Sequence, residues 1–151
     1  MYPRAKTLGL IYKGNQILLE ENEGKHSKGT GTYYRPIGGT IEIGEKSRDT
    51  IRREFLEELA VEVEITRYIT CMENIFEIEG SIGHEIIQIY EVAFKDSALY
   101  QRESFQVNEG SRVTTAKWIH LKDLFDGKKQ LYPEDLKNFL LTPLVRSPII
   151  T

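Results

Sequence analysis

The sequence predicts an α/β sandwich in which helices pack on a mixed β-sheet. Two observations support this fold class. Short runs of β-branched and aromatic residues, separated by turn residues, recur along most of the chain and are typical of strands. The stretch Ser47–Leu59 has neither glycine nor proline and carries apolar residues every four positions, which indicates a helix with one buried face. Strands mixed with helices form layers around one core.

The composition is that of one globular domain, which we expect to cover residues 1–151. Apolar residues make up 40% of the chain and charged residues 28%, and the apolar runs are too short to span a bilayer. The N-terminus lacks the apolar core of a secretory signal, and the single cysteine, Cys71, cannot form an internal disulfide. We therefore expect a cytoplasmic protein. A net charge of −3 without a basic block predicts neither DNA nor membrane partners.

The first quarter of the chain predicts strands joined by turns. Lys6–Tyr12 and Gln16–Glu20 are rich in β-forming residues, and Lys13-Gly14-Asn15 between them has the composition of a hairpin turn. Glu21–Thr32 is polar and contains three glycines, which predicts a mobile surface loop. Tyr33–Ile37 follows as a short strand.

The rest of the chain predicts a helix, a second hairpin and a closing helix. Ser47 is a suitable N-cap for the helix, whose buried face carries Ile51, Phe55 and Leu59. After it we expect strands at Val61–Ile78 and His84–Phe94 joined by a turn at Glu79–Gly83, a long polar loop at Lys95–Gly110, a strand at Arg112–Ile119, and a helix from Pro133 that buries Leu136, Phe139 and Leu140.

Three glutamates gather on one side of the first helix. At about 100° per residue, Glu54, Glu57 and Glu58 form a cluster beside the apolar face. Like charges at these spacings repel, and the C-terminal half of a helix disfavours anions, at a combined cost of about 1 kcal/mol that neighbouring arginines offset in part. One interpretation is a solvated acidic face. The other is a set of hard oxygen ligands suited to Mg²⁺ or Mn²⁺.

The residues before the helix favour the metal interpretation. Gly38 and Gly39 let bare backbone approach the cluster and offer a carbonyl. Glu42 and Glu45 bring two further acids from the connecting loop. Divalent cations would convert such an anionic pocket into one that attracts a diphosphate.

The segment Gly39–Val61 also resembles the signature of the Nudix hydrolase family. That signature consists of a glycine, five residues, a glutamate, seven residues, Arg-Glu, an apolar residue, any residue, Glu-Glu, any residue, a glycine and an apolar residue. Only Ala60 departs from it, where the family has glycine. The matching positions are Gly39, Glu45, Arg53-Glu54-Phe55, Glu57-Glu58 and Val61.

The resemblance implies a Nudix-type α/β/α sandwich, a mixed β-sheet flanked by helices, and an enzymatic function. Nudix hydrolases cleave a diphosphate linkage in a nucleoside diphosphate joined to another group, such as a nucleoside triphosphate or a nucleotide sugar. The partner would be a small nucleotide-type molecule whose identity the sequence leaves open. The alternative is a non-catalytic nucleotide- or metabolite-sensing module on the same fold.

The resemblance also implies a ligand set for Mg²⁺, with Mn²⁺ as a substitute. The set consists of carboxylates of the cluster, a backbone carbonyl, and an acid that acts through water or a second metal. These groups belong to Glu54, Glu57 and Glu58, to Gly38 or Gly39, and to Glu45.

Catalytic roles follow from the same resemblance. Arg53 would orient carboxylates through an ion pair, with a plain surface arginine as the alternative. Either Glu57 or Glu54 would take the proton of the attacking water, and the sequence does not separate the two.

Three residues outside the signature are candidates for substrate binding. Tyr33 and Arg35 point to one face of their strand, so a base could stack on Tyr33 while Arg35 binds a phosphate. Core packing with a surface arginine is the alternative. Glu85, on another strand, could serve as an additional metal ligand.

Ala60 lies where the helix ends and the chain turns into a strand. If the position requires a positive φ, alanine costs about 1 kcal/mol there. We expect instead that the turn has adjusted and that Ala60 keeps ordinary helical backbone angles.

Overall fold

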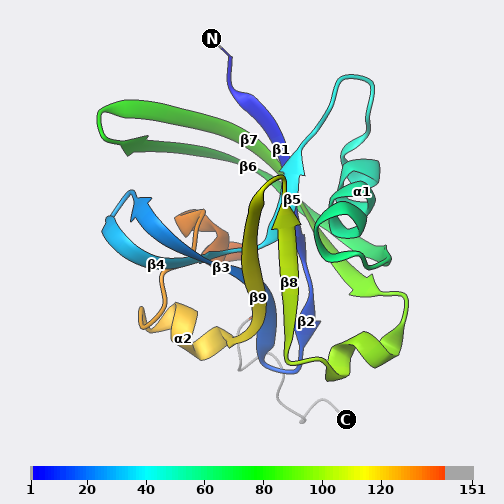
Figure 1. Ribbon diagram of the computed structural model, residues 1–151. Helices are drawn as coiled ribbons and strands as arrows, with labels where there is room; N and C mark the ends of the chain where they lie inside the picture. Colours follow the sequence, from blue (N-terminus) through cyan, green and yellow to red (C-terminus); the bar gives the residue numbers. More distant parts are fainter. Residues whose placement is uncertain (1, 142–151) are drawn as a thin grey trace.

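The computed structural model describes residues 2–141, which form two β-sheets with short helices around them (Figure 1). The elements in chain order are β1 (Arg4–Leu10), β2 (Tyr12–Lys13), β3 (Gln16–His26), β4 (Gly29–Arg35), β5 (Ile37–Thr40), α1 (Ser47–Leu59), β6 (Val63–Ile78), β7 (Ser81–Phe94), the 3-10 helix η1 (Ser97–Gln101), β8 (Ser104–Glu109), β9 (Arg112–His120), α2 (Leu121–Phe125) and the 3-10 helix η2 (Glu134–Phe139).

The first sheet has the strand order β5-β1-β7-β6 and is mixed, as predicted. Strand β1 pairs antiparallel with β5 and parallel with β7, while β6 and β7 form a long antiparallel hairpin. The parallel pair joins segments far apart in the chain. It brings the glycines of β5 to one side of β1 and the strand that carries Glu85 to the other.

The second sheet has the order β2-β3-β9-β8, with β4 paired to β3. The prediction of a mobile loop at Glu21–Thr32 is wrong, because β3 and β4 continue as a paired hairpin from Glu20↔Arg35 to His26↔Gly29. Most of this hairpin buries little apolar surface, so backbone pairing holds it and no hydrophobic alternation marks it. Pro36 separates β4 from β5 within the segment predicted as one strand.

Two further segments differ from their predicted form. The polar loop expected at Lys95–Gly110 contains η1 and the strand β8, in which Phe105 and Val107 alternate into the core beside exposed polar residues. The closing helix is a 3-10 helix that follows Pro133. It buries Leu136 but leaves Phe139 half-exposed. The strand expected at Arg112–Ile119 is β9.

Helix α1 has the predicted bounds and packs its apolar face on the first sheet. Ile51 and Phe55 are fully buried, and a Cβ added at Gly9 of β1 would come within 2.7 Å of the Phe55 ring. Glycine at that position therefore lets the helix approach the sheet closely. The N-cap is Lys46, and the hydroxyl of Ser47 contacts the Tyr90 hydroxyl at 2.6 Å.

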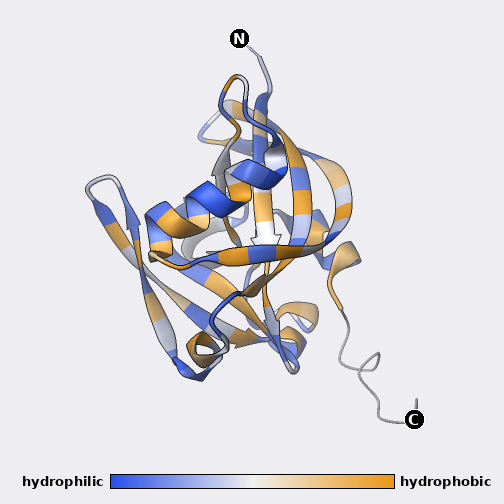
Figure 2. Cartoon of the chain, turned by 90° about the vertical axis from the view of Figure 1, so that its right-hand side faces the viewer, coloured by the Kyte–Doolittle hydropathy of each residue, from blue (hydrophilic) through white to orange (hydrophobic). Residues whose placement is uncertain are grey.

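Hydrophobic and hydrophilic residues are interspersed along many of the strands (Figure 2). In β8 buried and exposed residues alternate, which places one face against the core, whereas β1 and β3 each contain four consecutive buried residues. Within residues 2–141, no helix is long and apolar enough to cross a membrane.

The turn after α1 contradicts the expected backbone of Ala60. Its φ of 57° and ψ of 38° lie in the left-handed region, and its N–H donates to the Leu56 carbonyl at 3.0 Å. The next residue, Val61, must enter the core at once, and a left-handed residue turns the chain in that direction. Alanine therefore occupies a conformation that costs about 1 kcal/mol relative to glycine.

Candidate active site

The guanidinium of Arg53 connects the loop before α1 to the acids of the helix. Its Nε and Nη2 donate to the two carboxylate oxygens of Glu45 at 2.7 and 2.9 Å. Its Nη1 donates to Glu54 at 2.8 Å and to Glu57 at 2.9 Å, and Nη2 also reaches the Thr40 carbonyl at 3.2 Å. Arg53 is therefore a positioning group and not a free surface arginine.

Glu45 is fixed as an anion by this contact. The hydrogen bonds from Arg53, followed by the one from the Thr50 hydroxyl at 2.7 Å, lower the pKa of Glu45 to about 2. The carboxylate thus acts as a fixed acceptor in the loop and holds Arg53 against the helix.

The pKa of Glu58 is shifted in the opposite direction to that of Glu45. Its side chain is buried, and burial followed by the adjacent Glu54 carboxylate raises the pKa of Glu58 to about 9. Glu109 and Glu20 add to the shift from the neighbouring sheet. Acids from the helix and from the neighbouring sheet therefore surround Glu58, and a cation placed beside it would favour its charged form.

Gly38 and Gly39 lie in β5 at closest approach to β1 and α1. A Cβ at Gly39 would lie 2.6 Å from each carboxylate oxygen of Glu54, and one at Gly38 would lie 2.0 Å from the Thr7 carbonyl. Only glycine admits the backbone so close to the acids. The sequence-based prediction that bare backbone approaches the cluster agrees with this packing.

The candidate metal ligands are only partly assembled. Glu54 and Glu58 lie side by side next to Gly39, whereas the carboxylate of Glu57 is turned toward Arg53. Across residues 2–141, no three acidic, histidine or cysteine side chains converge closely enough to hold an ion as they stand. The donor chemistry nevertheless suits a hard divalent cation, since every group is an oxygen and the Glu58 site favours added positive charge.

These acids line a cleft of about 590 Å³. Cationic side chains line the same cleft and lie among the acids: Arg53 contacts Glu54, and Arg112 contacts Glu109. The acids are Glu20, Glu42, Glu54, Glu58, Glu85 and Glu109, and the cations are Arg4, Lys6, Arg35, Arg53 and Arg112.

The sequence alone did not predict several residues of the cleft. Glu20 is buried and accepts a hydrogen bond from Thr114, and Arg112 donates to Asn22 at 2.5 Å. A charged residue directly after the apolar pair Leu18-Leu19 was a usable signal for Glu20. Glu109 and Arg112 carry no such signal, because the pairing of β9 with β3, which is remote in sequence, brings the β8–β9 turn to the cleft.

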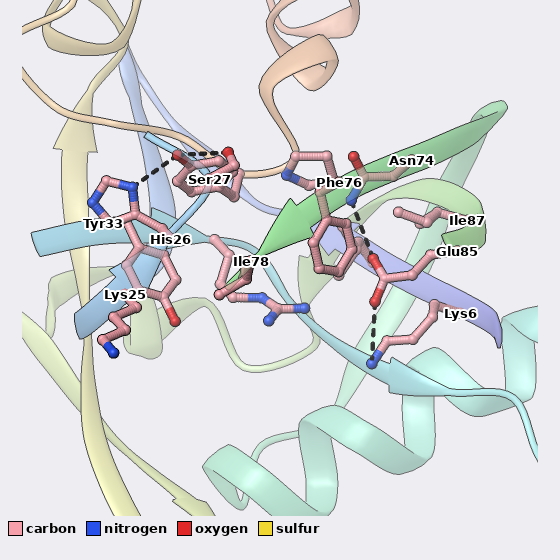
Figure 3. Close-up of a pocket in the computed structure, with 14 residues that line it drawn as sticks. Lys6, Lys25, His26, Ser27, Tyr33, Asn74, Phe76, Ile78, Glu85 and Ile87 are labelled. Carbon is pink, nitrogen blue, oxygen red and sulfur yellow. Dashed lines mark hydrogen bonds and ion pairs between the residues drawn. The ribbon is translucent and has the colours of Figure 1, made fainter. Parts of the chain in front are cut away.

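A second cavity, of about 100 Å³, adjoins the cleft (Figure 3). Aromatic rings surround one end of it: the rings of His26, Tyr33 and Tyr132 lie 5.3 to 5.6 Å apart between centroids. We call it the aromatic pocket. Of the three candidate substrate residues, Tyr33 lines the aromatic pocket but not the cleft, while Arg35 and Glu85 line both cavities.

The model of the NUDIX domain family matches residues 3–141. The chain belongs to this family. Members of the family generally use a divalent metal and act on small nucleotide-type substrates. This membership favours the enzyme over the sensing module.

Relatives and solved structures agree with the family. The chain is 33% identical over 60 residues to an NAD-capped RNA hydrolase NudC of Pectobacterium carotovorum subsp. carotovorum (strain PC1), covering 40% of this chain and 22% of that protein. It is 24% identical over 100 residues to the NudC of Haemophilus influenzae (strain PittGG), covering 66% and 38%. The chain thus spans well under half the length of these relatives.

The fold matches solved Nudix structures along most of the chain. The MutT protein from Methanosarcina mazei Go1 superposes with a TM-score of 0.62 at 16% identity, covering 91% of this chain and 90% of that one. An ADP-ribose pyrophosphatase from Streptococcus suis 89-1591 superposes with a TM-score of 0.61 at 18% identity, covering 97% and 95%. These likenesses confirm the predicted Nudix-type fold.

Proposed function

We propose that this protein is a Mg²⁺-dependent hydrolase that cleaves a diphosphate linkage in a nucleoside diphosphate joined to another group, such as a nucleoside triphosphate or a nucleotide sugar. The observation that carries the proposal is the adjacent pair Glu54 and Glu58 beside Gly39, in a cleft that is also lined by cationic side chains. A polyanion bound there would contact the cations directly and the acids through a metal.

The residues that would hold the metal are Glu54, Glu58 and the Gly39 carbonyl, with Glu57 joining when it leaves Arg53. Gly38 and Glu45 support this set, Gly38 through backbone packing and Glu45 through Arg53. A bound Mg²⁺, or Mn²⁺ in its place, polarises phosphoryl oxygens and lowers the pKa of an attacking water.

The remaining catalytic work falls to side chains of α1. Arg53 donates from a single nitrogen, Nη1, to both Glu54 and Glu57, which brings the two carboxylates together on one side of the helix. One of the two accepts the proton of the attacking water. Glu54 lines the cleft, and Glu57 is the more exposed of the pair.

Substrate binding would use cationic side chains of the cleft and the aromatic pocket. The side chain of Arg35 makes no hydrogen bond or ion pair with any residue between positions 2 and 141, so its guanidinium is available for a phosphate. Tyr33 offers a ring face in the adjoining pocket for a base. Such contacts would position the diphosphate without taking part in its cleavage.

The test is a panel of nucleoside triphosphates, nucleotide sugars, ADP-ribose and dinucleoside polyphosphates, assayed for released phosphate and pyrophosphate with and without Mg²⁺. We expect cleavage of at least one class, and absence of cleavage across the whole panel would contradict the proposal. We further propose that residues 1–151 act as one cytoplasmic domain, which cell fractionation and limited proteolysis would test.

A further inference from the structure

Glu85 lies where the cleft and the aromatic pocket meet. It comes from β7 and lines both cavities together with Lys6, Arg35 and Phe76. The residue is only 6% exposed, and its carboxylate is turned toward Phe76 and the cavity (Figure 3). A ligand that spans the two cavities must pass this carboxylate.

The carboxylate of Glu85 has unused capacity to accept hydrogen bonds. Asn74 donates to Oε1 at 3.3 Å, while Arg4 and Lys6 approach Oε2 only to 3.7 and 3.9 Å, beyond hydrogen-bonding distance. An ionised carboxylate offers about four acceptor positions. A buried acceptor that is so incompletely satisfied favours a ligand that brings its own donors.

The surroundings indicate which part of a nucleotide lies beside Glu85. The aromatic pocket has room for a flat ring and is lined by ring faces, while the cleft holds the acids and cations that suit a metal-bound diphosphate. The group that joins the ring to the phosphates would then lie at the shared wall. Glu85 itself repels phosphate, whereas Lys6 and Arg35 beside it attract it.

Lys6 and Arg35 agree with this placement of the ring in the aromatic pocket and the diphosphate in the cleft. Burial, followed by the charge of Arg35, lowers the pKa of Lys6. The side chains of Lys6 and Arg35 both line the two cavities. They can therefore take the phosphate nearest the sugar, which leaves Glu85 for neutral donors.

We propose that Glu85 accepts hydrogen bonds from the 2′- and 3′-hydroxyls of a ribose, and that the substrate is a ribonucleotide and not its 2′-deoxy counterpart. This inference rests on the proposed function. A carboxylate binds a cis-diol through two adjacent donors, as the acidic residue of dinucleotide-binding sites binds the ribose hydroxyl. Removing the 2′-hydroxyl leaves a buried acceptor unpaired, and sites of that kind discriminate strongly against the analogue.

The experiment compares matched ribo- and 2′-deoxynucleoside triphosphates of all four bases. We expect the wild-type enzyme to favour the ribonucleotide by at least about tenfold in kcat/KM for the bases that it cleaves. Glu85→Gln should reduce that preference at least about threefold, because an amide offers one acceptor oxygen in place of two. Glu85→Ala should bring it close to one.

The matched control is Glu73→Gln. Glu73 is exposed on β6, next to Asn74 but on the opposite face of the strand. The substitution therefore removes the same charge from the same hairpin without touching the cavity wall. It should keep the wild-type preference. Thermal melts of all three variants establish that they are folded.

Three results would overturn the inference. The first is an active wild-type enzyme without ribose preference, and the second is a preference that survives in Glu85→Ala. The third is a Glu85→Gln variant that loses activity equally on both sugars and needs at least about tenfold more Mg²⁺, which would make Glu85 a metal ligand. Calorimetric binding of methylene-bridged ribo- and 2′-deoxynucleoside diphosphates reads the same preference without hydrolysis, so an inactive panel would count against the proposed function alone.

Discussion

Arg53 donates two hydrogen bonds, of 2.7 and 2.9 Å, to the carboxylate of Glu45, although eight positions separate the two residues in the chain. This pair closes the loop onto α1 and leaves Nη1 of the guanidinium for the acids of the helix. A lysine has no planar fork and can contact these groups only as a point charge.

We expect Arg53→Lys to lower kcat at least about tenfold while the fold is retained. The lysine keeps the charge but cannot bridge the loop and two helix acids at once. Steady-state kinetics and a thermal melt measure the two effects. Arg52→Lys is the matched control, since Arg52 pairs with Asp49 alone among residues 2–141, on the exposed side of α1. Equal kcat in both variants would contradict a positioning role for Arg53.

Activity should depend on a divalent metal, because the cluster of acids around Glu58 repels a polyanion when no cation is present. We expect turnover at millimolar Mg²⁺ or Mn²⁺, none in excess EDTA, and full recovery when Mg²⁺ is added back. Phosphate release measured across this cycle provides the test. Undiminished turnover in EDTA would rule out the proposed mechanism.

Glu54→Gln and Glu57→Gln should each lower kcat by at least about 10², the scale expected for a lost general base or metal ligand. Each substitution also removes a repelling charge from the helix, so the metal-free melting temperature should stay equal or rise. Glu62→Gln, exposed beyond the helix, controls for charge alone. Near-wild-type kcat in both helix variants would mean that the site lies elsewhere.

The lowered pKa of Glu45 predicts acid sensitivity of the folded state. The group ionises near pH 2 when folded and near 4.5 when unfolded, so its contribution to stability is complete above about pH 4.5 and is lost as the pH falls toward 2. Glu45→Gln should therefore flatten the fall of stability in this window. Urea unfolding between pH 2 and 6 measures it, and identical slopes in both proteins would contradict the assignment.

Ala60→Gly should stabilise the fold by up to about 1 kcal/mol, because the backbone there is left-handed. The opposite exchange at another left-handed position, Gly127→Ala, should destabilise the fold by a similar amount. Gly127 has a φ of 81° and open space around its Cβ position, so backbone conformation alone decides the effect. Thermal melts of both variants test the pair. Destabilisation by Ala60→Gly would show that unfolded-state entropy outweighs the strain.

How far the sequence predicts this molecule depends on how local the signal is. Helix α1 was predicted with its bounds because Ile51 and Phe55 repeat at helical spacing, and the family signature falls on the same segment. The β3–β4 hairpin was missed because its outer part is held by backbone pairing and lacks hydrophobic alternation. Strand β8 was missed because two apolar residues, Phe105 and Val107, are too few to stand out in a polar stretch.

The residues of the candidate site also fall into those that a local pattern predicts and those that only the fold brings together. Arg53, Glu54 and Glu58 lie on one helix, so their spacing alone predicts that they are neighbours. Glu20 and Glu109 reach the cleft only through pairing of strands remote in sequence, which no local pattern encodes. The geometry of Ala60 depends on where Val61 must go next, and that is a property of the packed core.

The cleft and the aromatic pocket share a wall built from Lys6, Arg35, Phe76 and Glu85. An occupant of one cavity therefore changes the charge and the shape that the other presents. Binding in the two cavities is then thermodynamically linked, and the linkage is reciprocal: a ring that tightens cation binding by some factor is itself bound more tightly by the same factor when the cation is present. Measured affinities for nucleotide and for metal will each have meaning only at a stated concentration of the other.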